Sequence, residues 1–302
     1  MENQPINPQI SNEKKHWYDR TYWLLFMVPA LLLILSIIYV GSIYVKTGDI
    51  IYKDVTLTGG TTLTLVNSTI SALDMEKSLQ SKYTDLVVRS LTDVQTGKQT
   101  AISIETKSEP DQLKKDVESI LGVTLKEDDF SIEFTGSVLS QTFYSELLRA
   151  VILAFVFMAI TVFIIFKVPI PSLAVIFAAV TDITITLAIV DILGMRISTA
   201  GIAAFLMLIG YSVDTDILLT TRVLRRKETG PFLERMKSAL KTGLTMTFSG
   251  IVAMLAAYLI VQSPVLKQVF LIIIIGLFVD ILATWLGNTA ILKWYCDRHN
   301  IK

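Results

Sequence analysis

Long apolar runs dominate the chain, and six of them are long enough to cross a membrane. A helix needs about 20 mostly apolar residues to span the hydrocarbon core of a bilayer. The six predicted spans are roughly Trp23–Val45, Leu147–Lys167, Pro171–Leu193, Ser198–Thr221, Gly243–Val261 and Lys267–Leu292. The first run is too long for a cleaved signal peptide, and no small-residue cleavage site follows it. The pattern predicts an α-helical polytopic membrane protein with a short segment, 1–22, before the spans and a tail, 293–302, after them.

The stretch between the first two spans, residues 46–140, has a different pattern. Alternation of apolar and polar residues predicts four strands, at Thr61–Val66, Asp85–Val94, Thr100–Thr106 and Phe130–Phe134. Helical spacing predicts one helix over Ser71–Tyr83 and a second that begins at Pro110. The resulting order, β-α-β-β-α-β, is that of a ferredoxin-like fold. We therefore expect one α+β domain outside the membrane, followed by a bundle of five further helices over 147–292.

A tight turn is predicted directly before the first strand, at Gly59, Gly60 and Thr61. Two adjacent glycines favour a turn that needs positive φ angles. A phosphate-binding loop is the alternative, but no Lys-Ser/Thr pair follows at the spacing that such a loop requires. A second turn is predicted at Thr96-Gly97, between the two central strands.

The composition supports a membrane protein without a metal or cofactor. Of the 302 residues, 52% are hydrophobic and 18% are charged, and the mean hydropathy is +0.57. A soluble domain has about 25% charged residues. The 27 basic and 27 acidic residues cancel, so the chain has no basic excess for nucleic acid. Cys296 is the one cysteine in the sequence, and His16 and His299, the two histidines, lie near the termini, which argues against a cysteine metal cluster or a histidine-based active site.

The basic residues of the short loops predict the orientation in the bilayer. They gather in the N-terminal segment, between the fourth and fifth spans and in the tail: Lys14, Lys15, Arg20, Arg222, Arg225, Arg226, Lys227, Arg235, Lys237, Lys241, Lys293, Arg298 and Lys302. The short loops on the other side have only Arg196 and Lys267. Because positive loops face the cytoplasm, we expect both termini to be cytoplasmic and residues 46–140 to lie outside the cell membrane.

Ionisable residues inside the predicted spans are the candidate ion relay. Asp182 and Asp280 lie near the middle of the third and sixth spans, Asp214 and Asp216 lie in the cytoplasmic half of the fourth span, and Arg222 ends that span. A charge at the bilayer centre costs about 2.5–3.5 kcal/mol on insertion scales, so these side chains must face protein, water or a partner charge. A structural alternative stays open: a buried Asp can hold the bundle together by bonding to Ser or Thr, and Arg222 can be one more cytoplasmic cation.

Helical geometry separates the two acidic residues of the fourth span. Asp214 and Asp216 are two positions apart, about 200° around a helix, so they cannot point the same way. Asp214 and Arg222 are eight positions apart and lie on broadly the same side. One carboxylate is therefore expected to face the bundle, and the other a partner.

The fourth span also contains a motif that resembles a known family. Gly210, Tyr211 and Ser212, followed by Val-Asp-Thr-Asp up to Asp216, resemble the Gly-Tyr-Ser-hydrophobic-Asn-Asp signature of the SecF family of protein-export membrane proteins. The third span reads Ala-Ala-Val-Thr-Asp-Ile from Ala178, similar to the Ala-x-x-His-Asp-Val stretch of that family. The predicted order of one span, an exterior domain and five spans also matches. Thr181 replaces the usual His and Asp214 the usual Asn, which resembles the archaeal branch.

The resemblance implies a heteromeric complex with SecD beside the Sec translocation channel. It further implies an RND-like bundle that assists exported polypeptide chains by using a proton gradient, or sometimes a sodium gradient. By motif position, Asp182 and Arg222 match the ion-relay residues of the family best, and Asp214 matches a position of SecD.

Three other functions compete with this one. The chain could be a passive scaffold for SecD. It could also be half of an RND-type exporter of small molecules or lipids, although the resemblance to that class implies larger exterior domains and a duplicated chain. An aspartyl intramembrane protease could pair Asp182 with Asp214, but the Gly-x-Gly-Asp motif of that class is missing. The sequence thus favours an auxiliary export subunit that is not an enzyme.

Overall fold

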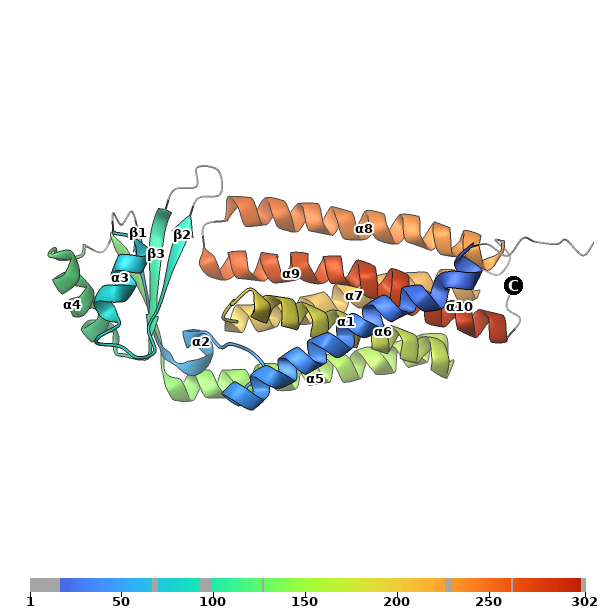
Figure 1. Ribbon diagram of the computed structural model, residues 1–302, viewed down its shortest axis with the longest axis horizontal. Helices are drawn as coiled ribbons and strands as arrows, with labels where there is room; N and C mark the ends of the chain where they lie inside the picture. Colours follow the sequence, from blue (N-terminus) through green and yellow to red (C-terminus); the bar gives the residue numbers. More distant parts are fainter. Residues whose placement is uncertain are drawn as a thin grey trace, which may run out of the picture.

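The computed structural model describes residues 17–66, 70–92, 99–126, 128–225, 230–261 and 263–299. Long helices run side by side, and a small α+β domain caps one end of them, at the left of Figure 1, while the C-terminus lies at the opposite end. This arrangement confirms the predicted fold class. The turn at Thr96-Gly97 and several predicted cytoplasmic cations, among them Lys14 and Lys15, lie outside the described residues.

Among the described residues, six helices are long and apolar enough to cross a membrane. They are α1 (Trp17–Thr47), α5 (Ser137–Phe166), α6 (Pro169–Ile192), α7 (Thr199–Arg225), α8 (Phe232–Ile260) and a last helix over 264–298. The last helix is made of α9 (Pro264–Leu282), a π-helical segment η2 (Ala283–Asn288) and α10 (Thr289–Arg298). Several helices extend well beyond the predicted spans, because a hydropathy window marks only the apolar turns and misses the polar turns that continue the same helix.

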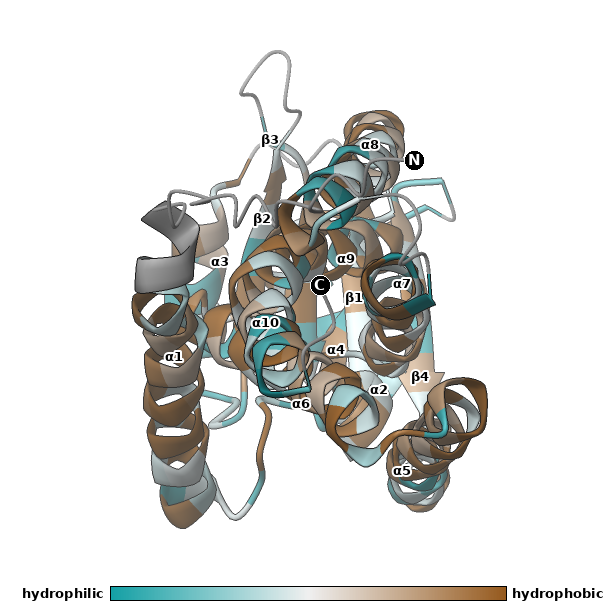
Figure 2. Cartoon of the chain, turned by 90° about the vertical axis from the view of Figure 1, so that its right-hand side faces the viewer, coloured by the Kyte–Doolittle hydropathy of each residue, from teal (hydrophilic) through white to brown (hydrophobic). Residues whose placement is uncertain are grey.

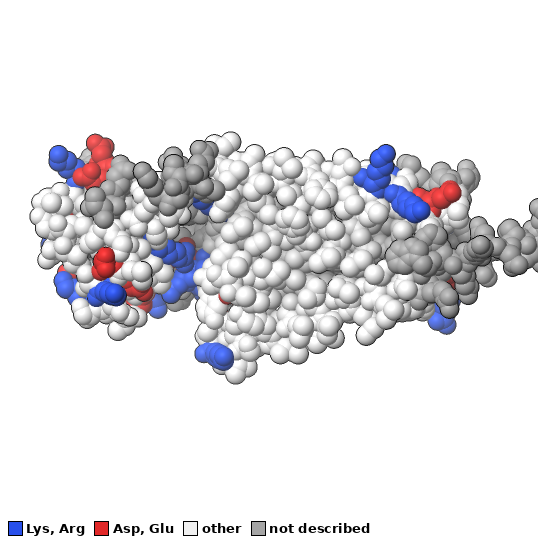
Figure 3. Space-filling view, turned by 45° about the horizontal axis from the view of Figure 1, so that its top comes forward, with Lys and Arg blue, Asp and Glu red and all other residues white. Residues whose placement is uncertain are grey.

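The helices form an inner and an outer layer. About half of the residues in the apolar windows of α6, α7 and the last helix are buried, against fewer than a fifth in α1, α5 and α8. Many large hydrophobic side chains of the outer helices are exposed, and α1 and α5 are coloured mainly as hydrophobic in Figure 2. On the face shown in Figure 3, charged side chains gather at the two ends and are nearly absent between them. An uncharged band of this kind is what a hydrocarbon layer requires.

The α+β domain has the predicted ferredoxin-like topology. Its elements are β1 (Gly60–Val66), α3 (Ala72–Leu79), β2 (Val87–Thr92), β3 (Gln99–Thr106), α4 (Pro110–Leu121) and β4 (Phe130–Thr135). The strands pair antiparallel in the order β2-β3-β1-β4. Leucine and isoleucine on one face of β1 and β3 pack with α3 and α4 to form the domain core.

The other face of this sheet is polar and points toward the membrane helices. Successive residues of a strand point to opposite faces, so Thr62 and Thr64 of β1 lie opposite the core, beside Ser103 and Glu105 of β3. The sheet lies between α3 and α4 on one side and the ends of the membrane helices on the other (Figure 1).

A backbone bridge joins the domain to the bundle. The segment between α1 and the short helix α2 (Val55–Thr58) forms a parallel bridge with the turn that precedes α7. The Asp54 amide donates to the Ile197 carbonyl at 3.0 Å, and the Ile197 amide donates to the Tyr52 carbonyl at 2.7 Å. The entrance of the domain is therefore held directly against the start of α7.

The predicted glycine turn is confirmed. Gly59 and Gly60 have φ angles of +84° and +142°. A Cβ atom on Gly59 would lie 2.4 Å from the Ser137 Cα at the start of α5. The turn and α5 are therefore too close together for any residue other than glycine at position 59.

We expect Gly59→Ala to lower the free energy of unfolding by about 1–3 kcal/mol, because the positive φ and the contact with α5 both oppose a Cβ atom. Thermal unfolding of the purified protein in detergent measures the loss. Gly136→Ala is the matched control: Gly136 has an ordinary φ of −64° and open space around it. Equal stability of the two variants would contradict the assignment.

Candidate functional site

Three carboxylates meet in the interior of the bundle. Asp182 of α6, Asp216 of α7 and Asp280 of α9 each have 0% of their surface exposed. They come from the three inner helices, and Asp280 and Asp216 lie close enough to Asp182 to interact with it electrostatically. The structure thus brings together three of the five residues predicted as an ion relay.

Asp216 and Asp280 are linked by threonine hydroxyls. The Thr284 hydroxyl lies 3.0 Å from Asp216 Oδ1 and 3.1 Å from Asp280 Oδ1, and so bridges the two carboxylates. The Thr215 hydroxyl lies 3.0 Å from Asp280 Oδ2 and 2.8 Å from the Ser212 carbonyl oxygen. Two acidic side chains therefore share one continuous hydrogen-bond network.

The number of protons in this network limits its charge. A hydroxyl has one hydrogen to donate, so Thr215 cannot donate to both the Ser212 carbonyl and an ionised Asp280. If Asp280 carries a proton, it donates to Thr215, Thr215 donates to Ser212, and Thr284 donates to Asp216. The fourth contact, between Thr284 and Asp280 Oδ1, then still lacks a hydrogen. A second proton, on Asp216, supplies it, because Asp216 then donates to Thr284 and Thr284 donates to Asp280. The arrangement is built for at least one shared proton.

Asp216 has a further donor in Asn288. The Asn288 side-chain amide donates to Asp216 Oδ1 at 2.7 Å. The other Asp216 oxygen, Oδ2, is buried without a hydrogen-bond partner in the described part of the chain. Asp216 is thus held in place at one oxygen and open at the other.

Asp182 is the least satisfied member of the site. Both of its carboxylate oxygens are buried without a hydrogen-bond partner among the described residues, as are the hydroxyls of Ser212 and Thr186. These hydroxyls lie near Asp182 but outside hydrogen-bond geometry. An unpaired ionised carboxylate in such a place is very costly. Asp182 needs a proton, a water molecule or a cation when the bundle is in this state.

A π-helical segment positions two of the ligating side chains. Thr284 and Asn288 belong to η2, which follows Asp280 closely. Single π-helical turns inside α-helices occur frequently at functional sites, because they rotate the side chains that follow. Thr215, Thr284 and Asn288 were not among the residues predicted from sequence. The spacing of Asp280, Thr284 and Asn288, at i, i+4 and i+8, is the signal that could have found the last two.

The remaining two relay candidates lie elsewhere. Asp214 is exposed on the outside of α7, while Asp216 is buried, as the 200° separation predicts. Arg222 donates to the Ser238 carbonyl at 2.6 Å and to its hydroxyl at 2.8 Å, near the start of α8. The structure therefore does not bring either residue to the carboxylate cluster.

The inner helices α7 and α9 are held close together between the carboxylate site and the α+β domain. A Cβ atom on Gly276 of α9 would lie 2.2 Å from the Leu208 side chain of α7. At the ends nearest the α+β domain, the Gln268 amide oxygen accepts from the Ser198 hydroxyl at 2.5 Å and from its backbone N–H at 3.1 Å, and the Gln268 amide nitrogen donates to the Arg196 carbonyl. Close packing and a polar clamp thus hold α7 and α9 at a fixed distance.

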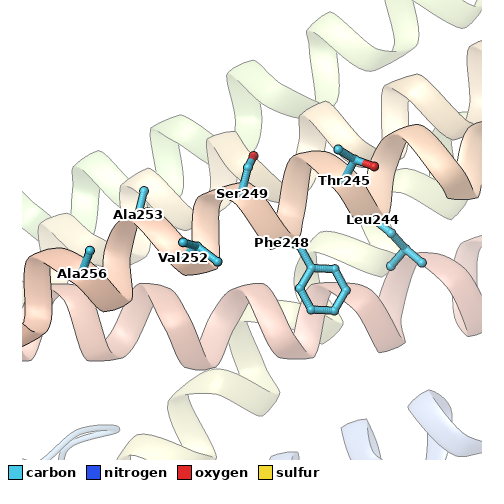
Figure 4. Close-up of a pocket in the computed structure, with 7 residues that line it drawn as sticks. All are labelled: Leu244, Thr245, Phe248, Ser249, Val252, Ala253 and Ala256. Carbon is cyan, nitrogen blue, oxygen red and sulfur yellow. The ribbon is translucent and has the colours of Figure 1, made fainter.

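Other parts of the described chain offer less chemistry. No group of three or more His, Cys, Asp or Glu side chains in the described ranges is placed to hold a metal ion. A surface groove of about 630 Å³ runs along α8, and all of its lining residues lie on that one helix (Figure 4). Its lining has no ionisable side chain, which is typical of a lipid-facing surface.

Comparison with known proteins agrees with this architecture. The model of the family "Protein export membrane protein SecD/SecF, C-terminal" matches residues 117–298. Protein-export membrane protein SecF of Methanocaldococcus jannaschii is 37% identical over 94% of this chain and 99% of its own. The SecF of Methanothermobacter thermautotrophicus is 48% identical over 55% of this chain and 60% of its own. The chain belongs to the SecF family of protein-export membrane proteins.

A solved structure shows the same fold. SecDF of Thermus thermophilus, a translocon-associated membrane protein, superimposes with a TM-score of 0.73 at 17% identity. The match covers 95% of this chain and 39% of the SecDF chain, so this chain spans about two fifths of that protein. Membership of the SecF family thus rests on the sequence relatives, and the SecDF structure adds the fold.

We expect Thr284→Val to lower the free energy of unfolding by about 1–3 kcal/mol, because it leaves buried carboxylate oxygens without their donor. Thermal unfolding in detergent measures the change. Thr245→Val is the matched control, because the exposed Thr245 hydroxyl bonds only to the Lys241 carbonyl of its own helix. A loss of the same size in both variants would mean that Thr284 does not support the carboxylates.

Proposed function

We propose that this chain is an auxiliary subunit of the Sec protein-export machinery that works with SecD and uses a proton gradient across the cell membrane. The observation that carries the proposal is the cluster of Asp182, Asp216 and Asp280 inside a bundle whose relatives are named as protein-export membrane proteins. The cargo is the exported polypeptide chain, and the termini face the cytoplasm.

The hydrogen-bond network favours protons as the coupling ion. Asp280 and Asp216 share the Thr284 hydroxyl, and the four contacts of this network all contain a hydrogen only when both carboxylates hold a proton. Ionisable residues inside a membrane commonly form proton relays. Movement of a proton between Asp182 and this pair would change which helices attract one another.

A stripe on α7 supports SecD as the partner. Met207, Gly210, Tyr211 and Asp214 are exposed and follow helical spacing, so they lie along one side of α7. The Asp214 carboxylate forms no hydrogen bond or ion pair with another described residue. A carboxylate facing lipid at this depth would cost about 2.5–3.5 kcal/mol. This stripe, here called the α7 stripe, is the surface that would pack against a helix of SecD.

The route from the site to the exterior domain is short. The inner helices α7 and α9 are joined at their outer ends by Gln268, and the start of α7 is bridged to residues 52–54. A shift of α7 against α6 would therefore move the entrance of the exterior domain. That domain would help to pull or release the emerging polypeptide.

Proton coupling predicts that Asp182→Asn and Asp280→Asn slow export. Asparagine has nearly the same size as aspartate but cannot bind and release a proton. We expect each variant, as the only SecF in the cell, to secrete a reporter at the rate that wild-type cells show after a protonophore has removed the gradient. Pulse-labelling of the reporter, with and without the protonophore, measures this rate.

Asp297→Asn is the control for this experiment, because Asp297 is exposed at the end of α10 and, among the described residues, forms an ion pair with Lys293 alone. It should export at the wild-type rate and keep its sensitivity to the protonophore. Normal export by both buried variants would instead identify the chain as a passive scaffold whose carboxylates only hold the bundle together.

The α7 stripe predicts a variant that loses its partner without losing its fold. A Cβ atom on Gly210 would meet no neighbouring atom within 4 Å, so Gly210→Trp fits the isolated chain but would collide with a helix packed on the stripe. We expect mild-detergent purification from the native membrane to recover SecD with the wild-type chain and much less with Gly210→Trp. Val252→Trp on the exposed side of α8 is the control. Equal recovery of SecD with both variants would move the interface away from the α7 stripe.

A further inference from the structure

A polar cavity separates the β-sheet from the membrane helices. It has a volume of about 510 Å³ and lies between the polar face of the sheet, the turn between α6 and α7, and the adjacent ends of α8 and α9. The ionisable residues of its lining are Asp54, Arg89, Glu105, Glu133, Tyr258 and Lys267. The cavity is thus the place where the exterior domain is docked on the bundle.

Glu105 is the buried acid of this cavity. It lies on β3 opposite Thr62 of β1, with 4% of its surface exposed. Its Oε1 atom lies 3.6 Å from Arg89 Nη1, which is long for an ion pair, and its Oε2 atom has no hydrogen-bond partner among the described residues. A buried carboxylate that is only half paired is costly when ionised.

Charged groups from both the α+β domain and the bundle surround Glu105. Asp54, in the segment bridged to Ile197, lies next to it and adds a second negative charge. Arg89 on β2 and Arg196 in the turn before α7 oppose that effect. Glu133 and Lys267 line the same cavity from β4 and α9. Docking of the sheet therefore places Glu105 beside Asp54 and away from water.

We propose that Glu105 is a proton-binding site outside the membrane, and that its protonation holds the sheet docked on the turn before α7. Loss of the proton puts two carboxylates side by side, at the bridge between residues 52–54 and Ile197, and favours undocking. The device would make the contact between exterior domain and bundle sensitive to the pH around the sheet. It does not depend on which carboxylate inside the membrane carries protons.

The direction of the pH effect follows from linkage. Burial, and next the neighbouring Asp54, raise the pKa of Glu105 from 4.5 to about 7 in the docked state. Undocking exposes Glu105 to water, where its pKa returns toward that of an ordinary glutamate. Docking is therefore firmest at low pH and weakens as the pH rises through the interval between the two values. With these values, docking is about tenfold weaker at pH 8 than at pH 6.

Hydrogen exchange of the full chain in detergent tests the proposal without any gradient. The Asp54 and Ile197 amides, which form the bridge, report on docking. After correction for the intrinsic pH dependence of exchange, we expect these amides in the wild type to exchange about tenfold faster at pH 8 than at pH 6. Glu105→Gln cannot lose a proton, so its amides should stay protected at both pH values.

Glu133→Gln is the matched control. Glu133 lies in the same row of the sheet, on the other side of Thr62, but it is exposed. It should keep the wild-type pH dependence. Wild-type protection that does not change with pH would overturn the proposal even if Glu105→Gln failed to fold. A pH dependence that survives in Glu105→Gln, or vanishes in Glu133→Gln, would assign the effect to another group and overturn it as well.

Discussion

The cost of placing an ionised carboxylate in hydrocarbon governs the arrangement of the bundle. Asp182, Asp216 and Asp280 can exist at membrane depth only if other helices shield them and donors reach them. The shielding explains why α6, α7 and the last helix form the inner layer. The need for hydrogen-bond donors accounts for the threonines of α7 and η2. It also accounts for the π-helical turn, which places Thr284 and Asn288 beside Asp216.

The hydrogen bonds of the three carboxylates are distributed unevenly. Asp182 lacks hydrogen-bond partners within the described residues, whereas Asp216 and Asp280 share theirs. A fully satisfied network would be rigid, and a fully unsatisfied one would unfold the bundle. A cluster with one unpaired and two linked carboxylates can exist in two arrangements that differ by the position of a proton. The proposed ion coupling would use this property, whereas a purely structural network would not require it.

Sequence patterns predicted the fold well because its determinants are local. Hydropathy located the six helices, period-2 alternation located the four strands, and paired glycines located the turn at Gly59 and Gly60. The site was predicted only in part. Spacing correctly separated Asp214 from Asp216, but it could not show that Arg222 reaches Ser238 on α8 instead of the carboxylates. Which face of one helix meets which face of another depends on packing, as at Gly276 and Leu208, and on the π-helical turn, and neither is encoded in a single helix.

The hydrogen bonds at the domain-facing ends of the helices connect the site to the α+β domain. α7 carries Asp216 near its middle and packs closely against all the other membrane helices except α1. It begins at the turn that is bridged to residues 52–54. α9 carries Asp280 and is clamped to that same turn by Gln268. Under the proposed proton coupling, a proton that altered the attraction between α6 and the pair α7–α9 would therefore shift the turn on which the sheet is docked. Because the docked surface of the sheet contains its own buried acid, Glu105, the proposed proton sites in the bundle and at the sheet would respond to protons separately.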